Sequence, residues 1–188
     1  MNEGVSRWNH GRNADEPKGA SPMAGRITAA EEQLKPDPKF GDLVLSRFIN
    51  CMMKGGNKAT ATRIVYSAFD EIQKRLDDGK APELPENAIE VFHLALDNVR
   101  PSVEVRSKRV GGANYQVPMQ LNRRRQQSLT FRWIITAARE ERGKPIHMRL
   151  AKELWDAAHN EGKAATTREN THRMAEANRA FAHFGRGR

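Results

Sequence analysis

Apolar residues recur at intervals of three and four through most of the chain after Pro36, which is the spacing of α-helices that bury one face. Glycine pairs, prolines and polar residues interrupt the pattern and mark the ends of the helices. The pattern predicts six helices, at about 40–52, 61–76, 86–98, 123–141, 145–160, and from Thr166 or Thr167 to Phe181. Most of the folded part of the chain is therefore expected to be helical.

Each predicted helix has an apolar face that is expected to be buried against its neighbours. In the first helix this face includes Leu43, and in the fifth it includes Met148. Trp133 lies on the apolar face of the fourth helix, and Met174 and Ala177 lie on that of the sixth. We expect all five side chains to contribute to the core.

Between the third and fourth helices the period of the pattern changes from 3.6 residues to 2, which is the period of a β-strand. Tyr115, Val117 and other apolar residues alternate with polar ones, and Gly111-Gly112 supplies a tight turn. Pro118 is compatible with a two-stranded ribbon, because both of its strands are edge strands. The sequence therefore predicts a β-hairpin at about 103–121.

Together these elements predict a mainly α fold, a six-helix bundle with an extended two-stranded β-hairpin arm. Residues 1–34 show no sustained apolar period and are expected to form a disordered extension. Residues 35–184 form the predicted helical domain, and residues 185–188 form a short tail.

The positive charge of the chain is concentrated in one segment. The whole chain has 32 Lys and Arg against 23 Asp and Glu, a net charge of +9. Residues 101–150 alone hold 11 basic and 3 acidic side chains, a net charge of +8. Such clustering favours a polyanionic partner, whereas an evenly solvated basic surface is the plain alternative. The longest run without a charged residue, 13 residues at 110–122, is too short to span a membrane.

The fourth predicted helix has arginines at a spacing of seven. Arg125, Arg132 and Arg139 fall on one stripe, because seven residues bring a helix almost back to the same face. Arg123 and Arg124 add charge at the helix start, where the helix dipole disfavours cations. The alternative is a solvated face with salt bridges, and the helix itself offers two acids, both at its end. A phosphate-facing helix explains this pattern better.

The hairpin is the second candidate for contact with a nucleic acid. Arg106, Lys108 and Arg109 precede its turn, and Tyr115 follows it. Such a ribbon can bond phosphates while its aromatic ring stacks on a base. Alternatively, the hairpin packs on the domain with its charges outward.

Catalytic and metal-binding patterns do not stand out. None of the six histidines lies in a His-Glu-x-x-His motif, and a single cysteine excludes Cys-x-x-Cys. Cys51 lies among apolar residues of the first helix and is expected to be a buried thiol. We therefore predict neither an enzyme nor a resident cofactor or metal.

Several longer strings resemble one known family, ribosomal protein seven of the small subunit in its bacterial form. The resemblance covers about 35–184. Its most specific string runs from Glu104 to Gly112 in the hairpin, and the others are Pro36-Asp37-Pro38-Lys39-Phe40, Arg47-Phe48-Ile49-Asn50, Ile64-Val65-Tyr66-Ser67-Ala68, Asn98-Val99-Arg100-Pro101, Tyr115-Gln116-Val117-Pro118, Arg132-Trp133-Ile134 and His172-Arg173-Met174-Ala175-Glu176-Ala177-Asn178.

The resemblance implies a structural role in translation. It implies binding to the 3′ major domain of 16S-type rRNA, nucleation of head assembly, and a place near the exit-site tRNA and the mRNA path. It further implies ribosomal proteins nine and eleven as neighbours and a cytoplasmic location in the small subunit rather than an organelle. Matching positions and the charge pattern together give these candidate rRNA-binding residues: Lys35, Lys39, Lys58, Arg106, Lys108, Arg109, Tyr115, Arg123, Arg124, Arg125, Arg132 and Arg139.

The sequence also departs from the family pattern and leaves other functions open. Residues 1–34 have a net charge of −1, whereas the family's N-terminal arm is usually basic. The segment before the second helix, Gly56-Asn57-Lys58, has one cation fewer than the family's Gly-Lys-Lys. An architectural DNA-binding protein that uses the ribbon in a minor groove is the second hypothesis. An enzyme that acts on RNA is the third, and it rests only on a basic groove and scattered histidines.

Overall fold

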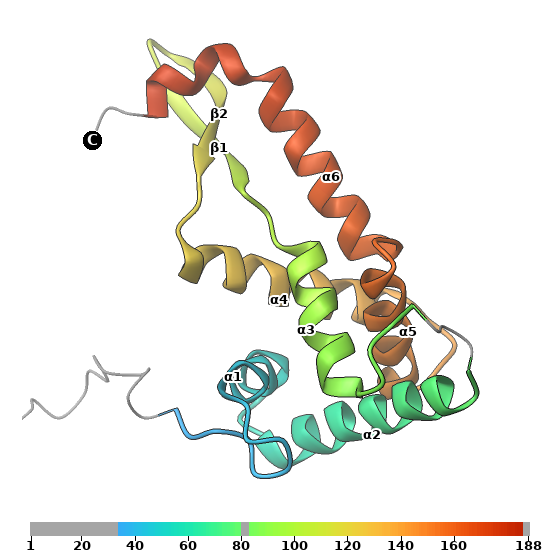
Figure 1. Ribbon diagram of the computed structural model, residues 1–188. Helices are drawn as coiled ribbons and strands as arrows, with labels where there is room; N and C mark the ends of the chain where they lie inside the picture. The colour runs from blue at the N-terminus through green and yellow to red at the C-terminus, as the bar shows by residue number, and fades with distance from the viewer. Residues whose placement is uncertain (1–33, 80–82, 186–188) are drawn as a thin grey trace, which may run out of the picture. The chain divides into compact units, whose positions relative to one another are not determined.

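The computed structural model describes residues 34–79 and 83–185, so the predicted extension at 1–34 lies outside the described residues except for Leu34. Six α-helices and one two-stranded antiparallel ribbon account for most of this part, and a 3₁₀ helix follows them (Figure 1). In chain order the elements are α1 Leu43–Met52, α2 Lys58–Asp77, α3 Ala88–Val99, β1 Val103–Val110, β2 Ala113–Gln120, α4 Arg123–Glu140, α5 Ile146–Ala158, α6 Gly162–Ala177 and η1 Arg179–Gly185. The predicted mainly α fold with a β-hairpin is confirmed.

Polar side chains set the starts of the helices. The Asp42 carboxylate accepts a hydrogen bond of 2.8 Å from the backbone N–H of Leu45, which satisfies one of the free donors at the start of α1. The helix does not extend back to Phe40 as predicted, because Asp37 accepts hydrogen bonds from the backbone N–H groups of Lys39 and Phe40 and holds a turn there. Helices α2 and α4 begin in the same way as α1, after an asparagine cap.

The core lies where α1 to α5 meet, and aromatic rings are at its centre. Phe48 of α1 contacts Phe92 of α3 and Phe131 of α4 edge-on, each with ring centroids 5.3 Å apart. Phe69 of α2 adds a fourth ring, 5.5 Å from Phe92. All four side chains are almost fully buried. Rings in this arrangement contribute both buried apolar area and favourable edge-to-face electrostatics, so this cluster ties four helices together.

The ribbon joins α3 to α4 and runs beside α6 and η1 (Figure 1). Its register pairs Val103 with Gln120 at the base and Val110 with Ala113 at the tip. Gly111 and Gly112 form the two-residue turn with φ angles of 57° and 90°. Two successive positive φ values are what a tight hairpin turn with the native strand twist requires, and glycine adopts them without strain.

The last helix differs from its prediction at both ends. It begins at Gly162, four residues before the predicted caps, and the Thr166 and Thr167 hydroxyls instead bond to carbonyls one turn back inside the helix. The buried Glu153 carboxylate of α5 caps it by accepting 2.8 Å from the Ala164 N–H. The helix ends at Ala177, and a 3₁₀ helix that the sequence pattern did not predict follows.

Several residues assigned to the core are exposed instead. Leu43 and Met174 keep 52% of their surface, and Met148 keeps 38%. Ala177 and Cys51 are also exposed, whereas Trp133 is half-buried. Periodicity identifies the apolar face of a helix, but the elements that cover each turn of that face are set by tertiary packing. No helix in the described residues is long and apolar enough to cross a membrane.

Candidate nucleic-acid interface

The segment with a net charge of +8 folds into the ribbon, α4 and the start of α5. Six of the predicted cations in this segment are exposed, namely Arg106, Arg109, Arg123, Arg124, Arg132 and Arg139. Of these, Arg109 on the ribbon and Arg123 and Arg132 on α4 form no hydrogen bond or ion pair with another described residue. Exposed guanidinium groups keep their donors available and bond phosphate oxygens with two N–H groups at once. These three side chains are therefore the best placed of the predicted cations to contact a polyanion.

The ribbon divides its cations between two faces. Directly paired residues in an antiparallel ribbon point to the same side, and successive residues alternate. Lys108 pairs with Tyr115 and Arg109 pairs with Asn114, so Lys108 and Arg109 lie on opposite faces. The Lys108 ammonium donates 2.6 Å to the backbone carbonyl of Phe184, which attaches its face to η1. Arg109 lies on the other face and is exposed.

Tyr115, predicted to stack on a base, packs within the protein. Its ring centroid is 5.1 Å from that of Phe181 and 5.5 Å from that of Phe184, both in η1. These contacts cover part of the ring and hold the last helical segment against the ribbon. The alternative considered for the hairpin, packing on the domain, therefore holds for this face.

The three arginines of the α4 stripe have different surroundings. The Arg125 Nε donates 3.0 Å to a carboxylate oxygen of buried Glu104 on β1, and Arg106 bonds the other oxygen. Arg139 donates 2.9 Å to the backbone carbonyl of Met52 at the end of α1. The few acids of α4 predict little salt bridging for this stripe. That prediction is wrong for Arg125, because its partner Glu104 comes from the ribbon. Arg132 and Arg139 are both exposed, and Arg132 alone of the three has no hydrogen-bond or ion-pair partner among the described residues.

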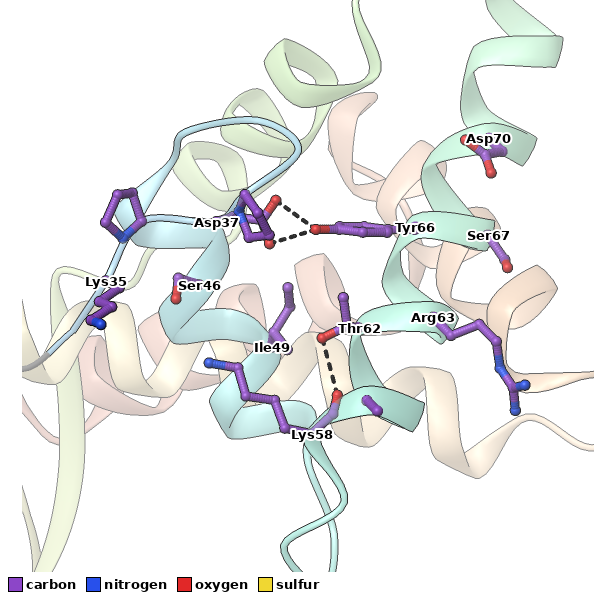
Figure 2. Close-up of a pocket in the computed structure, with 13 residues that line it drawn as sticks. Lys35, Asp37, Ser46, Ile49, Lys58, Thr62, Arg63, Tyr66, Ser67 and Asp70 are labelled. Atoms are coloured by element: carbon purple, nitrogen blue, oxygen red, sulfur yellow. Dashed lines mark hydrogen bonds between the residues drawn. The ribbon is translucent and has the colours of Figure 1, made fainter.

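The first two helices form a groove with cations at its rim. Its volume is about 860 Å³, and Lys35, Lys58 and Arg63 are among its lining residues (Figure 2). Figure 2 shows Asp37 and Tyr66 pointing toward each other, and the Tyr66 hydroxyl donates to the Asp37 carboxylate at 2.9 Å. Burial and this neighbouring carboxylate raise the pKa of Tyr66. The predicted cations Lys35 and Lys58 are exposed at this groove.

Lys39, a further predicted cation in this region, is engaged within the protein. Its ammonium lies 3.2 Å from an Asp70 carboxylate oxygen. It also lies 5.2 Å from the ring centroids of Phe40 and Tyr66, within range of a cation–π interaction. About half of the side chain remains exposed, so a phosphate has to compete with these partners.

Two arginines outside the predicted set join the interface. Arg47 of α1 and Arg100 after α3 line one groove together with Arg123 and Arg124 of α4. Arg47 and Arg100 are each isolated cations in the sequence, and 53 positions separate them. Only the packing of three helices brings them together, so neither spacing nor composition could identify them.

The described residues contain no group of three or more His, Cys, Asp or Glu side chains arranged to hold a metal ion. The closest histidine–carboxylate pair, His93 with Asp42 at 2.6 Å, supports the capped start of α1. The fold and its exposed cations define a helical, basic protein that presents a β-ribbon and one arginine-rich helix.

Comparison with known proteins gives the family. The family model described as Ribosomal protein S7p/S5e matches residues 24–179. The small ribosomal subunit protein uS7 of Rhodopirellula baltica is 54% identical over 160 residues, covering 85% of this chain and 98% of that protein. Those of Methylobacterium radiotolerans and Agrobacterium fabrum are 52% and 51% identical over 162 residues, covering 86% of this chain and 99% of each relative. The chain belongs to the S7p/S5e family of ribosomal proteins, which confirms the resemblance.

Membership also settles the broad functional class. The family is structural and non-enzymatic, so the prediction that the chain is not an enzyme is confirmed. The match begins at residue 24, eleven positions before the start of the resemblance drawn from sequence strings.

Proposed function

We propose that this chain is a structural constituent of the small ribosomal subunit that binds the 3′ major domain of its rRNA and nucleates assembly of the head. One observation carries the proposal. The most basic segment of the sequence folds into a ribbon and a helix on which Arg109, Arg123 and Arg132 are exposed. Family membership and the names of the curated relatives support the ribosomal setting.

The mode of binding follows from the side chains. Guanidinium groups neutralise phosphates and release the counterions that condense on RNA, which supplies most of the affinity. Folded RNA presents a deep, narrow major groove, so a rigid ribbon recognises its shape and backbone rather than a sequence of base edges. The contacts from Lys108 and Tyr115 to η1 fix the direction of this ribbon before RNA arrives. Such preorganisation lowers the entropy lost on binding.

The test is binding of the full chain to a 3′ major-domain rRNA fragment at two salt concentrations. Unrelated structured RNA and duplex DNA serve as competitors. The proposal expects selective binding to the rRNA fragment, with log K falling by about 0.7–0.9 for each phosphate neutralised as log salt rises. Equal affinity for all three nucleic acids contradicts the proposal, and a preference for duplex DNA favours an architectural DNA-binding protein.

The proposal includes the surroundings of the bound protein. We place it near the exit-site tRNA and the mRNA path, beside ribosomal proteins nine and eleven, in cytoplasmic ribosomes. Support comes from the resemblance and from the bacterial origin of the relatives. Crosslinking from a photoreactive residue at Asn114, in the exposed tip of the ribbon, tests this placement in assembled subunits. Crosslinks to tRNA, mRNA or either protein are expected, and crosslinks confined to distant subunit proteins contradict it.

A further inference from the structure

A second basic groove lies between α1, the end of α3 and the first turns of α4. Its volume is about 500 Å³. The six residues that line it are four arginines and two glutamines: Arg47, Arg100, Arg123, Arg124, Gln126 and Gln127. We call it the arginine groove.

The arginine groove is an unfavourable arrangement for the isolated protein. Four guanidinium groups converge on one space, where their mutual repulsion opposes folding. Two of them, Arg123 and Arg124, lie in the first turn of α4, where the helix dipole also disfavours positive charge. Arg100 has an ion pair of 2.6 Å with Asp97, but both side chains remain more than half exposed, so this pair contributes little. An anion bound in the groove would reduce the repulsion among the arginines and would interact favourably with the helix dipole at the start of α4.

The chemistry of the cations selects phosphate among anions. Arginine binds phosphate oxygens through two parallel N–H groups, and these charge-assisted bonds are among the strongest polar contacts in proteins. Because the four side chains come from three separate elements, they approach the space from several directions. That arrangement suits a phosphodiester, which presents two non-bridging oxygens.

The glutamines give the groove a second kind of contact. The Arg47 Nη1 donates 2.7 Å to Oε1 of Gln127. Arginine has donors only, so the Gln127 side-chain oxygen must face Arg47 and its NH₂ group must point elsewhere. That NH₂ forms no hydrogen bond with another described residue, so it can donate to an acceptor on a base. A space of this volume falls in the range of small-ligand sites and accommodates a base together with its phosphate.

We propose that the arginine groove binds a single unpaired nucleotide of the rRNA, with its phosphate among the arginines and its base edge at Gln127. This inference rests on the proposed function, which supplies the RNA. The nucleotide must be unpaired, because a base that is stacked and paired inside an RNA helix cannot enter a groove among these side chains. Guanidinium planes stack on exposed bases, so the arginines also contact the base face.

The groove is tested first without rRNA. The Nε–Hε signals of the full chain are followed by NMR during titration with uridine 5′-monophosphate, and in parallel with inorganic phosphate. Both probes are expected to shift the signals of Arg47 and Arg123, and the nucleotide is expected to bind more tightly. In the double variant R100Q/R123Q the Arg47 signal, which is still present, should no longer shift. The variant Q127L, which keeps every charge, should retain phosphate binding and lose the advantage of the nucleotide.

The matched control is R142Q/K144Q, which removes two positive charges beyond the other end of α4. The two sites lie at opposite ends of α4, whose 18 residues span about 27 Å at 1.5 Å per residue. This control should bind both probes like the unsubstituted chain. If R100Q/R123Q responds like the control, the groove is not an anion site and the inference fails. If Q127L binds the nucleotide as the unsubstituted chain does, the groove holds a phosphate alone and the proposed base contact is wrong.

The rRNA fragment then separates the two proposals. R100Q/R123Q should bind the fragment more weakly than R142Q/K144Q. Its slope of log K against log salt concentration should be shallower by the amount expected for about one phosphate contact. If the unsubstituted chain binds selectively and the two double variants bind equally, the groove inference fails and the proposed function stands. If the unsubstituted chain shows no selectivity, the proposed function fails, and the nucleotide titration still decides whether the groove is an anion site. Circular dichroism of each variant checks that it is folded.

Discussion

The Nε atom of Arg125 donates a hydrogen bond of 3.0 Å to a carboxylate oxygen of Glu104, which joins the first turn of α4 to the base of the ribbon. Glu104 is buried, with 7% of its surface exposed, and Arg106 bonds its other oxygen. A buried carboxylate needs such partners, because an ion without them is strongly disfavoured away from water. The ribbon therefore leaves the helical domain at an angle fixed by this three-residue cluster.

Removing Glu104 should destabilise the protein. In E104A both arginines lose their partner, and we expect the free energy of unfolding to fall by about 1–3 kcal/mol. Both arginines are partly exposed and regain water, which keeps the effect below that of a fully buried pair. Urea unfolding followed by circular dichroism measures the change. E176A, which removes an exposed pair with Arg179, is the control and should change stability by less than about 0.5 kcal/mol. Equal effects would show that the cluster does not hold the ribbon.

Arginines of the basic segment should separate into binding and structural residues. Arg109→Ala and Arg132→Ala each remove an exposed side chain. Each should weaken rRNA binding and make the slope of log K against log salt concentration shallower by about one. The melting temperature should change little. Arg139→Ala instead loses the hydrogen bond to the Met52 carbonyl, and its unfolding free energy should fall by about 1 kcal/mol.

Filter binding at two salt concentrations and thermal melting of the same three variants test this separation. A large fall in melting temperature for R109A or R132A would place that side chain in the fold rather than at the interface. Unchanged stability of R139A would show that its contact with the end of α1 contributes nothing.

The sequence predicted the elements better than their environments. Capping, periodicity and the glycine pair located six helices and the hairpin within a few residues, because these signals act between near neighbours in the chain. The sixth helix was misplaced because its cap, Glu153, comes from another helix. Met174 has helical spacing but no element over it, so it is exposed. The cap of one helix by another, and the burial of a side chain, depend on contacts between segments that are distant in the sequence. A local sequence pattern does not show these contacts.

For the candidate site, too, the sequence predicted the elements but not the surroundings of their side chains. Charge density identified the ribbon and α4, but it could not tell exposed Arg132 from Arg125, which has a partner on another element. Nor could it find Arg47 or Arg100, since neither has another Lys or Arg within five positions in the sequence. Which arginines gather in one groove depends on how three helices pack. The motif strings identified the family without giving any of this geometry.

Two neighbouring aromatic residues of α4 should differ in their contribution to stability. Phe131 is 1% exposed and contacts Phe48, so F131A should lower the unfolding free energy by about 3–5 kcal/mol. Trp133 is half-buried at the edge of the core, so W133A should lower it by about 1–2 kcal/mol despite the larger side chain. Urea unfolding of both variants measures the difference. A larger loss for W133A would mean that the edge of the core carries more packing energy than its exposure indicates.

The start of α6 predicts a dependence of stability on pH. Glu153 of α5 caps this helix through the Ala164 N–H, and the space that a side chain at Gly162 would need lies 3.1 Å from its carboxylate. Burial is the main cause that raises the pKa of Glu153 above its ordinary value of 4.5, and the nearby Asp156 carboxylate adds to it. The Ala164 hydrogen bond and Lys163 act in the opposite direction with smaller effect, and the Glu141 carboxylate acts with Asp156.

A raised pKa in the folded state means that the folded protein holds this proton more tightly than the unfolded chain. The contribution of Glu153 is therefore most favourable below pH 4.5 and is lost as the pH rises through the folded-state value. Glu153→Gln keeps an oxygen that accepts from Ala164 and cannot ionise. Its stability should match that of the unsubstituted chain at pH 4 and exceed it at pH 7. Glu153→Ala loses the cap and should be less stable than the unsubstituted chain by about 1 kcal/mol at pH 4. The difference should be smaller at pH 7, because the substitution also removes the buried carboxylate. Urea unfolding of the three proteins between pH 4 and pH 7 provides the comparison. If the unsubstituted chain is the more stable at pH 7, the attraction between the ionised carboxylate and the start of α6 outweighs the cost of burying it.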